Sequence, residues 1–408
     1  MLEKLSVDQA LMKARNHAEK GDFEEAQKLY QTISDSFCKQ AKDLEQRLSV
    51  SNKPKLNNVT QGMIPEVIDQ LSGLYNQGKY LDVVNQAEVC TRRFPELFIF
   101  WHLLGASAIK IGMPDKAIAA FKKVIFLKPD YPDAYNNMGV ALQDQGKLEE
   151  AIEAYNKAIE GFSKDISIKP DYAEAYRNLG IALKDQGKLE EAIEAFNKAI
   201  SIKPDYATAK HMLSALTGNT NETAPREYVE NLFDDYAKKF EASLVDKLEY
   251  KIPKIIRDIL IKPNNKKTLG SVLDLGCGTG LLGPEIKNHC SKLEGIDLSN
   301  KMLTLAKQKN IYDKLSQFDI MEYLSSMPLG FDYYVALDVF IYVGELTEIF
   351  RLIKSRNKKP GHLVFSTEHT EKDGYHLLRT LRYSHSKSYI ESLCKKFDYR
   401  ISHFSTTE

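Results

Sequence analysis

The sequence predicts two fold classes in one chain: an all-α solenoid of helical repeats over residues 1–216, and an α/β domain with a doubly wound, mostly parallel sheet over residues 227–408. Two observations predict this division. A six-residue phrase recurs through the first half, whereas in the second half strand-like apolar runs alternate with helical stretches, starting with Ser271–Leu275. Between the halves, Thr217–Pro225 is polar and rich in turn-forming residues, so we expect a linker over residues 217–226.

The repeated phrase begins with glycine and ends with alanine. It reads GMPDKA from Gly112 and GKLEEA from both Gly146 and Gly187, and Gly78 and Gly112 each stand 34 residues before the next glycine of the series. Each phrase lies between two amphipathic stretches, and a KPD tripeptide closes each of these units. Pairs of amphipathic helices at a constant period predict helical hairpins that stack side by side.

This period and these residue types resemble the tetratricopeptide (TPR) repeat. Small residues let the two helices of a hairpin approach, aromatic rings fill the space between hairpins, and proline ends the second helix. We expect about five repeats, the first two (at Gly21 and Gly78) degenerate, and a capping helix over Ala207–Leu216. The matching positions in the three clearest units are Trp101, Leu104, Gly105, Ala117, Phe121 and Pro129; Tyr135, Met138, Gly139, Ala151, Tyr155 and Pro170; and Tyr176, Leu179, Gly180, Ala192, Phe196 and Pro204.

Two irregular spacings interrupt the array. Gly146 and Gly187 are 41 residues apart, and the alignment isolates seven extra residues, Glu160–Ile166. Seven residues make about two helical turns, so we expect a longer helix rather than a broken repeat. Gly21 stands 57 residues before Gly78, so we expect a loop over Ser51–Gln61.

The predicted array offers a concave face to a protein or peptide partner. Five polar side chains on first helices could face such a groove, and the alternative is that they serve solubility and helix capping on an exposed face: Asn136, Asn137, Asn178, Arg177 and His102. Val140 and Ile181 occupy the positions where clamps for acidic C-terminal tails place asparagine, which disfavours that class of ligand.

Composition narrows the classes of function. The chain has 56 basic and 56 acidic residues, so no net charge draws it to nucleic acid or to an anionic membrane. Its five cysteines are scattered without a CxxC pair, so we expect neither a disulfide framework nor a metal site. The N-terminus is charged and amphipathic, and no apolar run approaches membrane-spanning length. We expect a soluble, cytoplasmic protein.

Strands and helices alternate through the second half. An aromatic-faced helix is expected over Arg226–Val245, followed by a second over Ile252–Leu260. The expected strands are Ser271–Leu275, Leu293–Leu298, a short strand before Asp319, Phe331–Asp338, Gly361–Glu368 and Tyr399–Phe404, and the other expected helices are Leu281–His289, Lys301–Lys309, Leu346–Ser355 and Ser386–Lys396. Such sheets bind ligands at the carboxyl ends of their strands. Acids recur at those ends, which points to a ligand rich in hydrogen-bond donors: Asp274, Asp297, Asp319 and Asp338.

The glycines that follow the first of these strands allow two kinds of cofactor. Gly278, Gly280 and Gly283 fit the dinucleotide pattern GxGxxG, and Asp297 lies about where that pattern places its ribose-binding acid. Asp274, however, would repel a pyrophosphate, whereas S-adenosylmethionine has no phosphate and carries a sulfonium and an ammonium. The acid therefore favours S-adenosylmethionine.

The stretch VLDLGCGTG followed by LEGIDLSNKML resembles the class I S-adenosylmethionine-dependent methyltransferases, which are Rossmann-like, and most resembles their ubiquinone- and biotin-pathway branch. The resemblance covers about residues 227–404, and with the repeats the chain is similar to predicted bacterial TPR-containing methyltransferases. It implies a cofactor site with the methionine end at Asp274, Gly276, Cys277, Gly278 and Gly280, the ribose at Asp297 beside Leu298, the adenine at Met302, Asp319 and Ile320, and the cleft at Leu337, Asp338 and Tyr342. FDDYA, from Phe233, resembles the family's lid and would place Tyr236 near the cofactor.

Methyl transfer from an activated carbon depends mainly on alignment and exclusion of water, so a general base is optional. The candidates for it are His385, His369 and Tyr342, while Asp338 would orient cofactor or acceptor. For His385, hydrogen bonding to substrate and helix capping are the alternatives. The family's sheet usually ends in an antiparallel pair, so either the strand after Tyr399–Phe404 is missing or the chain is truncated.

The leading interpretation is an active small-molecule or carrier-bound O-, N- or C-methyltransferase whose repeats dock a protein partner. Two alternatives stay open: a repeat scaffold with a vestigial methyltransferase domain, and a protein methyltransferase whose repeats present the substrate. Asp274 argues against nicotinamide chemistry, and no basic stripe or NPPY-type sequence indicates a nucleic-acid substrate.

Overall fold

A computed structural model describes residues 64–163, 169–241, 251–261 and 268–406. The chain divides into two units between residues 77 and 78, and the described residues of the first unit, 64–77, contain helix α3 (Ile64–Asn76). The repeat predicted at Gly21 and the loop predicted over Ser51–Gln61 lie outside the described residues. Within the described ranges, no helix is long and apolar enough to cross a membrane.

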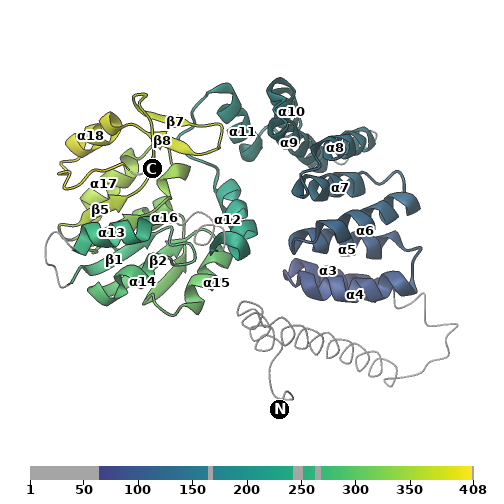
Figure 1. The fold of residues 1–408 in the computed structure, drawn as a ribbon, viewed down its shortest axis with the longest axis horizontal. Coiled ribbons are helices and arrows are strands. Elements are labelled where there is room, and N and C mark those ends of the chain that lie inside the picture. The colour runs from purple at the N-terminus through teal and green to yellow at the C-terminus, as the bar shows by residue number, and fades with distance from the viewer. Residues whose placement is uncertain (1–63, 164–168, 242–250, 262–267, 407–408) are drawn as a thin grey trace, which may run out of the picture. The chain divides into compact units, whose positions relative to one another are not determined.

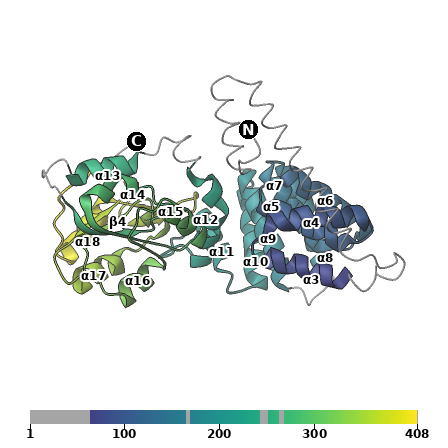
Figure 2. The ribbon, with the colours of Figure 1, turned by 90° about the horizontal axis from the view of Figure 1, so that it is seen from below.

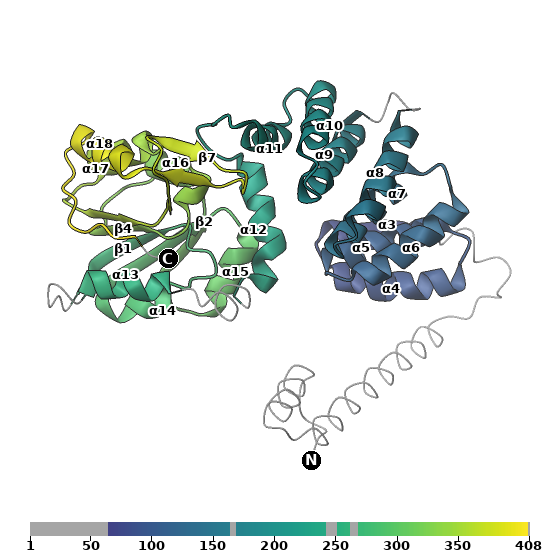
Figure 3. The ribbon, with the colours of Figure 1, turned by 45° about the horizontal axis from the view of Figure 1, so that its top comes forward.

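The repeat helices follow one another in antiparallel pairs, as predicted (Figure 3). Gly112, Gly146 and Gly187 lie in the turns between paired helices with φ of 73°, 73° and 84°, a region that side chains with a Cβ rarely adopt. The repeated glycine is therefore explained by its backbone conformation. The helices are α4 (Tyr80–Arg93), α5 (Phe98–Lys110), α6 (Pro114–Leu127), α7 (Pro132–Asp144), α8 (Leu148–Phe162), α9 (Lys169–Asp185), α10 (Leu189–Ile202) and α11 (Ala207–Thr217).

A second glycine in each pair lies against an aromatic ring. A Cβ added at Gly139 of α7 would stand 2.6 Å from Tyr155 of α8, and one at Gly180 of α9 would stand 2.8 Å from Phe196 of α10. The tetratricopeptide-like pattern of glycine and aromatic residue is thus a close packing of two helices around one buried ring.

The seven-residue insertion does not lengthen its helix as predicted. Helix α8 has 15 residues and ends at Phe162, whereas the equivalent α10 has 14. At this end Gly161 lies so close to Pro132 that a Cβ would be 2.5 Å from its ring, and the Ser163 hydroxyl donates to the carbonyl of Glu160. The helix gains one residue and stops, and residues 164–168 lie outside the described part of the chain.

The second half contains a parallel five-stranded sheet of order β3-β2-β1-β4-β5, which confirms the predicted class (Figure 1). Its strands are β1 (Gly270–Leu275), β2 (Cys290–Asp297), β3 (Lys314–Gln317), β4 (Tyr333–Ala336) and β5 (His362–Phe365). The flanking helices are α12 (Arg226–Glu241), α13 (Ile252–Ile261), α14 (Gly283–Ile286), α15 (Asn300–Gln308), α16 (Ile320–Ser326), α17 (Thr347–Arg356) and α18 (Lys387–Lys396), with the 3-10 turns η3 (Lys287–His289) and η4 (Phe340–Tyr342).

Helices cover both faces of this sheet because its strands are apolar on both sides. Leu273 and Leu275 of β1 pack with α16, α17 and α18, while Val272 of the same strand packs with α13 and α14. Figure 2 shows α13 and α14 on one side of the sheet and α16 and α17 on the other. The alternation along a single strand therefore divides the core into two layers with the sheet between them.

Three predicted elements differ from the structure. The helix expected over Leu281–His289 is only the short α14 followed by η3, and Tyr399–Phe404 forms no regular strand. The strand expected over Gly361–Glu368 ends at Phe365, and the two residues of β6 (Glu368–His369) belong instead to a small sheet with β7 (Tyr375–Leu377) and β8 (Tyr383–His385), in the order β6-β8-β7.

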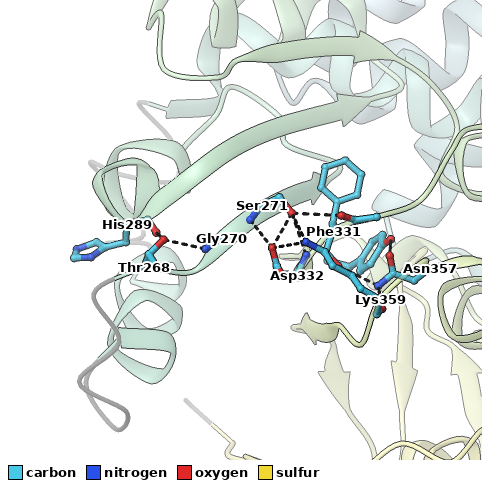
Figure 4. Close-up of polar contacts among 10 residues, drawn as sticks. Thr268, Gly270, Ser271, His289, Phe331, Asp332, Asn357 and Lys359 are labelled. Carbon is cyan, nitrogen blue, oxygen red and sulfur yellow. Dashed lines mark hydrogen bonds and ion pairs between the residues drawn. The ribbon is translucent and has the colours of Figure 1, made fainter.

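Asp332 anchors the amino ends of the central strands (Figure 4). Its Oδ2 accepts hydrogen bonds from the Ser271 amide at 2.8 Å, the Ser271 hydroxyl at 2.9 Å and Lys359 Nζ at 2.7 Å. Burial alone would raise the pKa of Asp332, but these donors outweigh it and hold the pKa at about 2. The carboxylate ties β1 to β4 at the edge opposite the predicted ligand site.

Candidate active site

Three glycines form the turn that leaves β1. Gly276, Gly278 and Gly280 have φ of 73°, 53° and 82°, all in the left-handed region. The amides of Gly276 and Cys277 both donate to the carbonyl of Ile296 in β2, at 2.8 and 2.9 Å. The turn is therefore fixed to the neighbouring strand at the carboxyl edge of the sheet.

Asp297 at the end of β2 is held against this turn. Its Oδ2 accepts from the Gly278 amide and its Oδ1 from the Ser299 amide, both at 2.8 Å. Burial raises the pKa of Asp297 to about 6, although those two amides favour the ionised form. Each carboxylate oxygen keeps a further lone pair, so the oriented group can still accept hydrogen bonds from a ligand such as a vicinal diol.

Asp274 in β1 lies beside it and is more deeply buried, with 3% of its surface exposed. Its Oδ2 accepts a hydrogen bond of 2.6 Å from the hydroxyl of Tyr312. Burial raises the pKa of Asp274 to about 7; the Tyr312 hydrogen bond opposes the rise and the Asp297 charge adds to it. Within the described ranges, no lysine or arginine forms an ion pair with either acid. The pair is therefore suited to a cationic ligand.

A continuous cavity of about 2520 Å³ brings most of the predicted residues together. This cavity also runs along β5 to His362 and Lys359 at the opposite edge of the sheet, so only part of its volume lies beside the glycine turn. Gly280 and Met302 do not line it, and the Met302 side chain is fully buried. The predicted residues that line it are Asp274, Gly276, Cys277, Gly278, Asp297, Leu298, Asp319, Ile320, Leu337, Asp338, Tyr342 and His385.

Asp319 caps a helix at the cavity wall. Its Oδ1 accepts from the amides of Met321 and Glu322, at 2.7 and 3.1 Å, and so caps the amino end of α16. The cap leaves the neighbouring Ile320 at the cavity surface. This explains why an acid follows β3, and it directs one carboxylate oxygen away from a ligand.

Asp338 follows β4 with φ of 54°, an unusual value for a residue with a Cβ. Its amide donates to Ser366 Oγ, and that hydroxyl donates to Asp338 Oδ1, both at 2.7 Å. Strained backbone of this kind persists where the surroundings impose it, and it is frequent at functional sites. Asp338 is thereby fixed in the cavity wall.

Tyr342 and His385, the two buried candidates for acid–base catalysis, differ in their surroundings. Burial raises the pKa of Tyr342, and the neighbouring Arg382 opposes that rise. His385 is 2% exposed, with Nδ1 at 2.6 Å from the Thr367 hydroxyl and Nε2 at 2.8 Å from the Gly344 carbonyl. Burial lowers the pKa of His385, and both of its nitrogens are occupied, so the structure favours a neutral, structural histidine.

Two further predictions concerned the cap of α18 and the role of His369. Ser386, not His385, caps α18, because its hydroxyl accepts from the Tyr389 amide at 3.1 Å. His369 is exposed and its Nε2 lies 2.9 Å from Glu371. Both predicted histidines line the cavity, and each already has protein partners there: His385 at both nitrogens and His369 at Nε2.

The expected lid corresponds to α12. Ser299 Oγ donates to Asp234 Oδ1 at 2.5 Å, and Lys301 pairs with the same carboxylate at 3.8 Å. Helix α12 thus contacts the start of α15, next to Asp297. The side chain of Tyr236, predicted near the cofactor, lies outside the described residues.

The predicted linker is bonded to the cavity wall. The amides of Gly344 and Glu345 donate to the carbonyl of Glu222, at 2.9 and 2.8 Å, and the amide of Ala224 donates to the carbonyl of Tyr342 at 3.0 Å. Residues 222–224 therefore continue into the fold of the α/β domain, which a polar, turn-rich composition does not reveal.

A protease distinguishes a bonded segment from a free linker. We expect a glutamate-specific protease to cleave after the exposed Glu371 well before it cleaves after Glu222, because cleavage requires the backbone to leave its hydrogen bonds. Mass spectrometry of the early fragments measures the order. Rapid cleavage after Glu222 in an otherwise folded protein would contradict the bonded segment.

Sequence reasoning missed two residues that shape the site. Tyr312 lies between α15 and β3 and reaches Asp274 across 38 positions of the chain. Ser299 both caps α15 and holds Asp234. The capping role can be read from a serine before a helix, but no sequence signal links Tyr312 to Asp274.

Family models match both halves of the chain. Residues 266–402 match "Methyltransferase domain", residues 130–205 match "Tetratricopeptide repeat" and residues 111–146 match "TPR repeat". Together these matches cover the predicted repeats from the second helix of the third repeat onward, and the whole five-stranded sheet.

Curated relatives match only part of their own length. The ubiquinone biosynthesis O-methyltransferase of Dechloromonas aromatica is 36% identical over 101 residues, 23% of this chain and 42% of that protein. The enzyme of the same name from Ralstonia nicotianae is 28% identical over 112 residues, 26% of this chain and 45% of that protein. The chain thus spans less than half the length of these relatives.

Among solved structures, magnesium protoporphyrin IX methyltransferase from Synechocystis PCC 6803 with bound SAM is 19% identical, covers 46% of this chain and 94% of its own, and has a TM-score of 0.37. At that score the overlap says nothing about chemistry.

The family match and the sheet order together lead to one conclusion: residues 266–402 form a class I methyltransferase domain of the S-adenosylmethionine-dependent kind, and residues 111–205 carry tetratricopeptide repeats.

Proposed function

We propose that this protein transfers a methyl group from S-adenosylmethionine to a small-molecule or carrier-bound acceptor, and that its repeats bind a protein partner. The observation that carries the proposal is the pair of buried acids, Asp274 and Asp297, at the ends of adjacent strands beside the glycine turn. Two such carboxylates with raised pKa values and no basic partner in the described part of the chain are stabilised by a cation.

S-adenosylmethionine fits these residues in charge and in hydrogen bonding. Its ammonium suits Asp274, its ribose diol suits the free lone pairs of Asp297, and its lack of phosphate avoids repulsion by either acid. When bound, it supplies a methyl group on a positively charged sulfur. The glycine turn lets the ligand approach the backbone because glycine has no side chain, and the positive φ of its three glycines is a conformation that residues with a Cβ rarely adopt.

The part of the cavity next to the glycine turn and the two acids supports the second part of the proposal, which concerns the acceptor. Leu337, Asp338 and Tyr342 line its wall, and the bonded segment 222–224 fixes the backbone of Tyr342. We assign these residues to positioning the acceptor and excluding water, which accounts for much of the catalysis in a direct displacement.

Cofactor binding is the first test. We expect the intact protein to bind S-adenosylmethionine and S-adenosylhomocysteine in calorimetry, and Asp297→Ala to weaken both by roughly a factor of ten or more, because the ligand loses an acceptor and the Gly278 and Ser299 amides lose theirs. Asp205→Ala, in the exposed turn after α10, is the matched control and should bind as the wild type does. Absence of binding by the intact protein would refute the proposal.

Turnover separates an enzyme from a scaffold. Incubation with S-adenosylmethionine carrying a labelled methyl group and a small-molecule extract is expected to transfer label to an acceptor. Transfer that requires the repeats and labels a protein would instead support a protein methyltransferase, whereas binding without any transfer would support a vestigial domain.

A further inference from the structure

We infer that Tyr312 is a positioning residue for the cofactor: its hydroxyl holds the Asp274 carboxylate in the orientation in which it accepts the cofactor's ammonium. This inference rests on the proposed function. It concerns a residue that lies outside the glycine turn and outside the strand-end acids that indicated the cofactor.

Three glycines leave the space that the ring of Tyr312 occupies. A Cβ at Gly280 or Gly283 would stand 2.9 Å from the ring, and one at Gly295 would stand 3.0 Å from it. These glycines belong to the turn after β1, to the start of α14 and to β2. Since real Cβ atoms scarcely ever approach so closely, all three elements must lack a side chain for the ring to occupy this position.

The fixed ring determines where its hydroxyl points. The Tyr312 hydroxyl donates to Asp274 Oδ2 at 2.6 Å, which orients the carboxylate while Asp274 still lines the cavity. A phenol donor stabilises a carboxylate without neutralising it. The remaining lone pairs of Asp274 are thus available to a cationic ligand.

The groups around Asp274 are acidic or neutral. Asp297 and the thiol of Cys277 interact with it from β2 and from the glycine turn, and Tyr312 from the segment before β3. Burial raises the pKa of Asp274 to about 7, so near neutral pH part of the protein carries a proton on this group. An arriving ammonium makes the same stabilising contact, and the displaced proton leaves to solvent.

The sign of the pH dependence follows from this exchange. Below the pKa of Asp274 the cofactor must displace a proton, so affinity rises as pH increases toward about 7 and then levels off. Asp297, with a pKa of about 6, contributes a separate step at lower pH. Removing the Tyr312 hydroxyl takes away a group that lowers the pKa of Asp274, so the upper step moves to higher pH.

The experiment measures S-adenosylhomocysteine binding by calorimetry from pH 5.5 to 8, in buffers of different ionisation enthalpy, for the wild type, Tyr312→Phe and Asp274→Asn. The wild type is expected to release a fraction of a proton at pH 7. Tyr312→Phe is expected to bind several-fold to about tenfold more weakly at pH 7 and to approach the wild type at higher pH, since one pKa unit corresponds to a factor of ten. Asp274→Asn should bind weakly and lose the upper step.

Tyr334→Phe is the matched control. Tyr334 is fully buried and donates to Asn357 at 2.9 Å, away from the cofactor turn, so its variant should lose similar thermal stability and keep the wild-type pH profile. An unchanged profile in Tyr312→Phe, with the wild type binding, would overturn the inference alone. No binding by the wild type at any pH would overturn the proposed function instead.

Discussion

Gly276→Ala is expected to lose most of its affinity for S-adenosylhomocysteine, by roughly tenfold or more, and to melt at a lower temperature. Gly276 has φ of 73°, and the added Cβ would stand 2.4 Å from a methyl group of Val339. The left-handed backbone alone costs about 1–3 kcal/mol for a residue with a Cβ, and the contact adds to it. Calorimetry and thermal unfolding measure the two effects.

Two further variants separate the backbone from the contact. Gly330→Ala is the control, because a Cβ there meets nothing within 4 Å. Val339→Ala introduced together with Gly276→Ala removes the contact but not the backbone strain, so it should restore part of the stability and affinity. If Gly276→Ala binds as the wild type does, the described turn does not hold the cofactor.

Tyr155→Ala is expected to destabilise the repeats by about 3–5 kcal/mol, the usual range for removing a large buried aromatic ring. Tyr155 of α8 is fully buried, its ring fills the space beside Gly139 of α7, and its hydroxyl donates to Gln143 at 3.1 Å. Urea unfolding followed by helical circular dichroism measures the change.

Tyr155→Phe keeps the ring and removes only the hydroxyl, so it should cost about 1 kcal/mol. Under conditions where the Tyr155→Ala protein is still folded, its affinity for S-adenosylhomocysteine should equal that of the wild type, because the α/β domain carries the site. A small loss of stability in Tyr155→Ala would show that the ring is not packed as described.

Local patterns were sufficient for much of the fold. The glycine phrase predicted the turns at Gly112, Gly146 and Gly187 because a left-handed backbone restricts a single residue. The five parallel strands could be predicted because apolar runs alternated with helical ones. The prediction of a longer α8 was wrong, since periodicity measures phase and not where a helix stops.

Contacts between segments that lie far apart in the chain could not be predicted from such local patterns. The small sheet of β6, β8 and β7 has strands of only two or three residues, too short for a periodic signal. His385 could be read as an acid–base group from its type alone, but Thr367 and Gly344 occupy its two nitrogens. The bond between Glu222 and the amides of Gly344 and Glu345 likewise joins residues far apart in the chain.

The sequence by itself determined the two fold classes, the glycine turn and the strand-end acids Asp274 and Asp297, because each depends on neighbours close along the chain. The tertiary structure alone decided that Tyr312 holds Asp274, that Met302 is buried in the core, and that residues 222–224 hold the wall at Tyr342. The physical reason is that hydrogen bonding and burial depend on distance in space, which folding sets between residues that no local pattern relates.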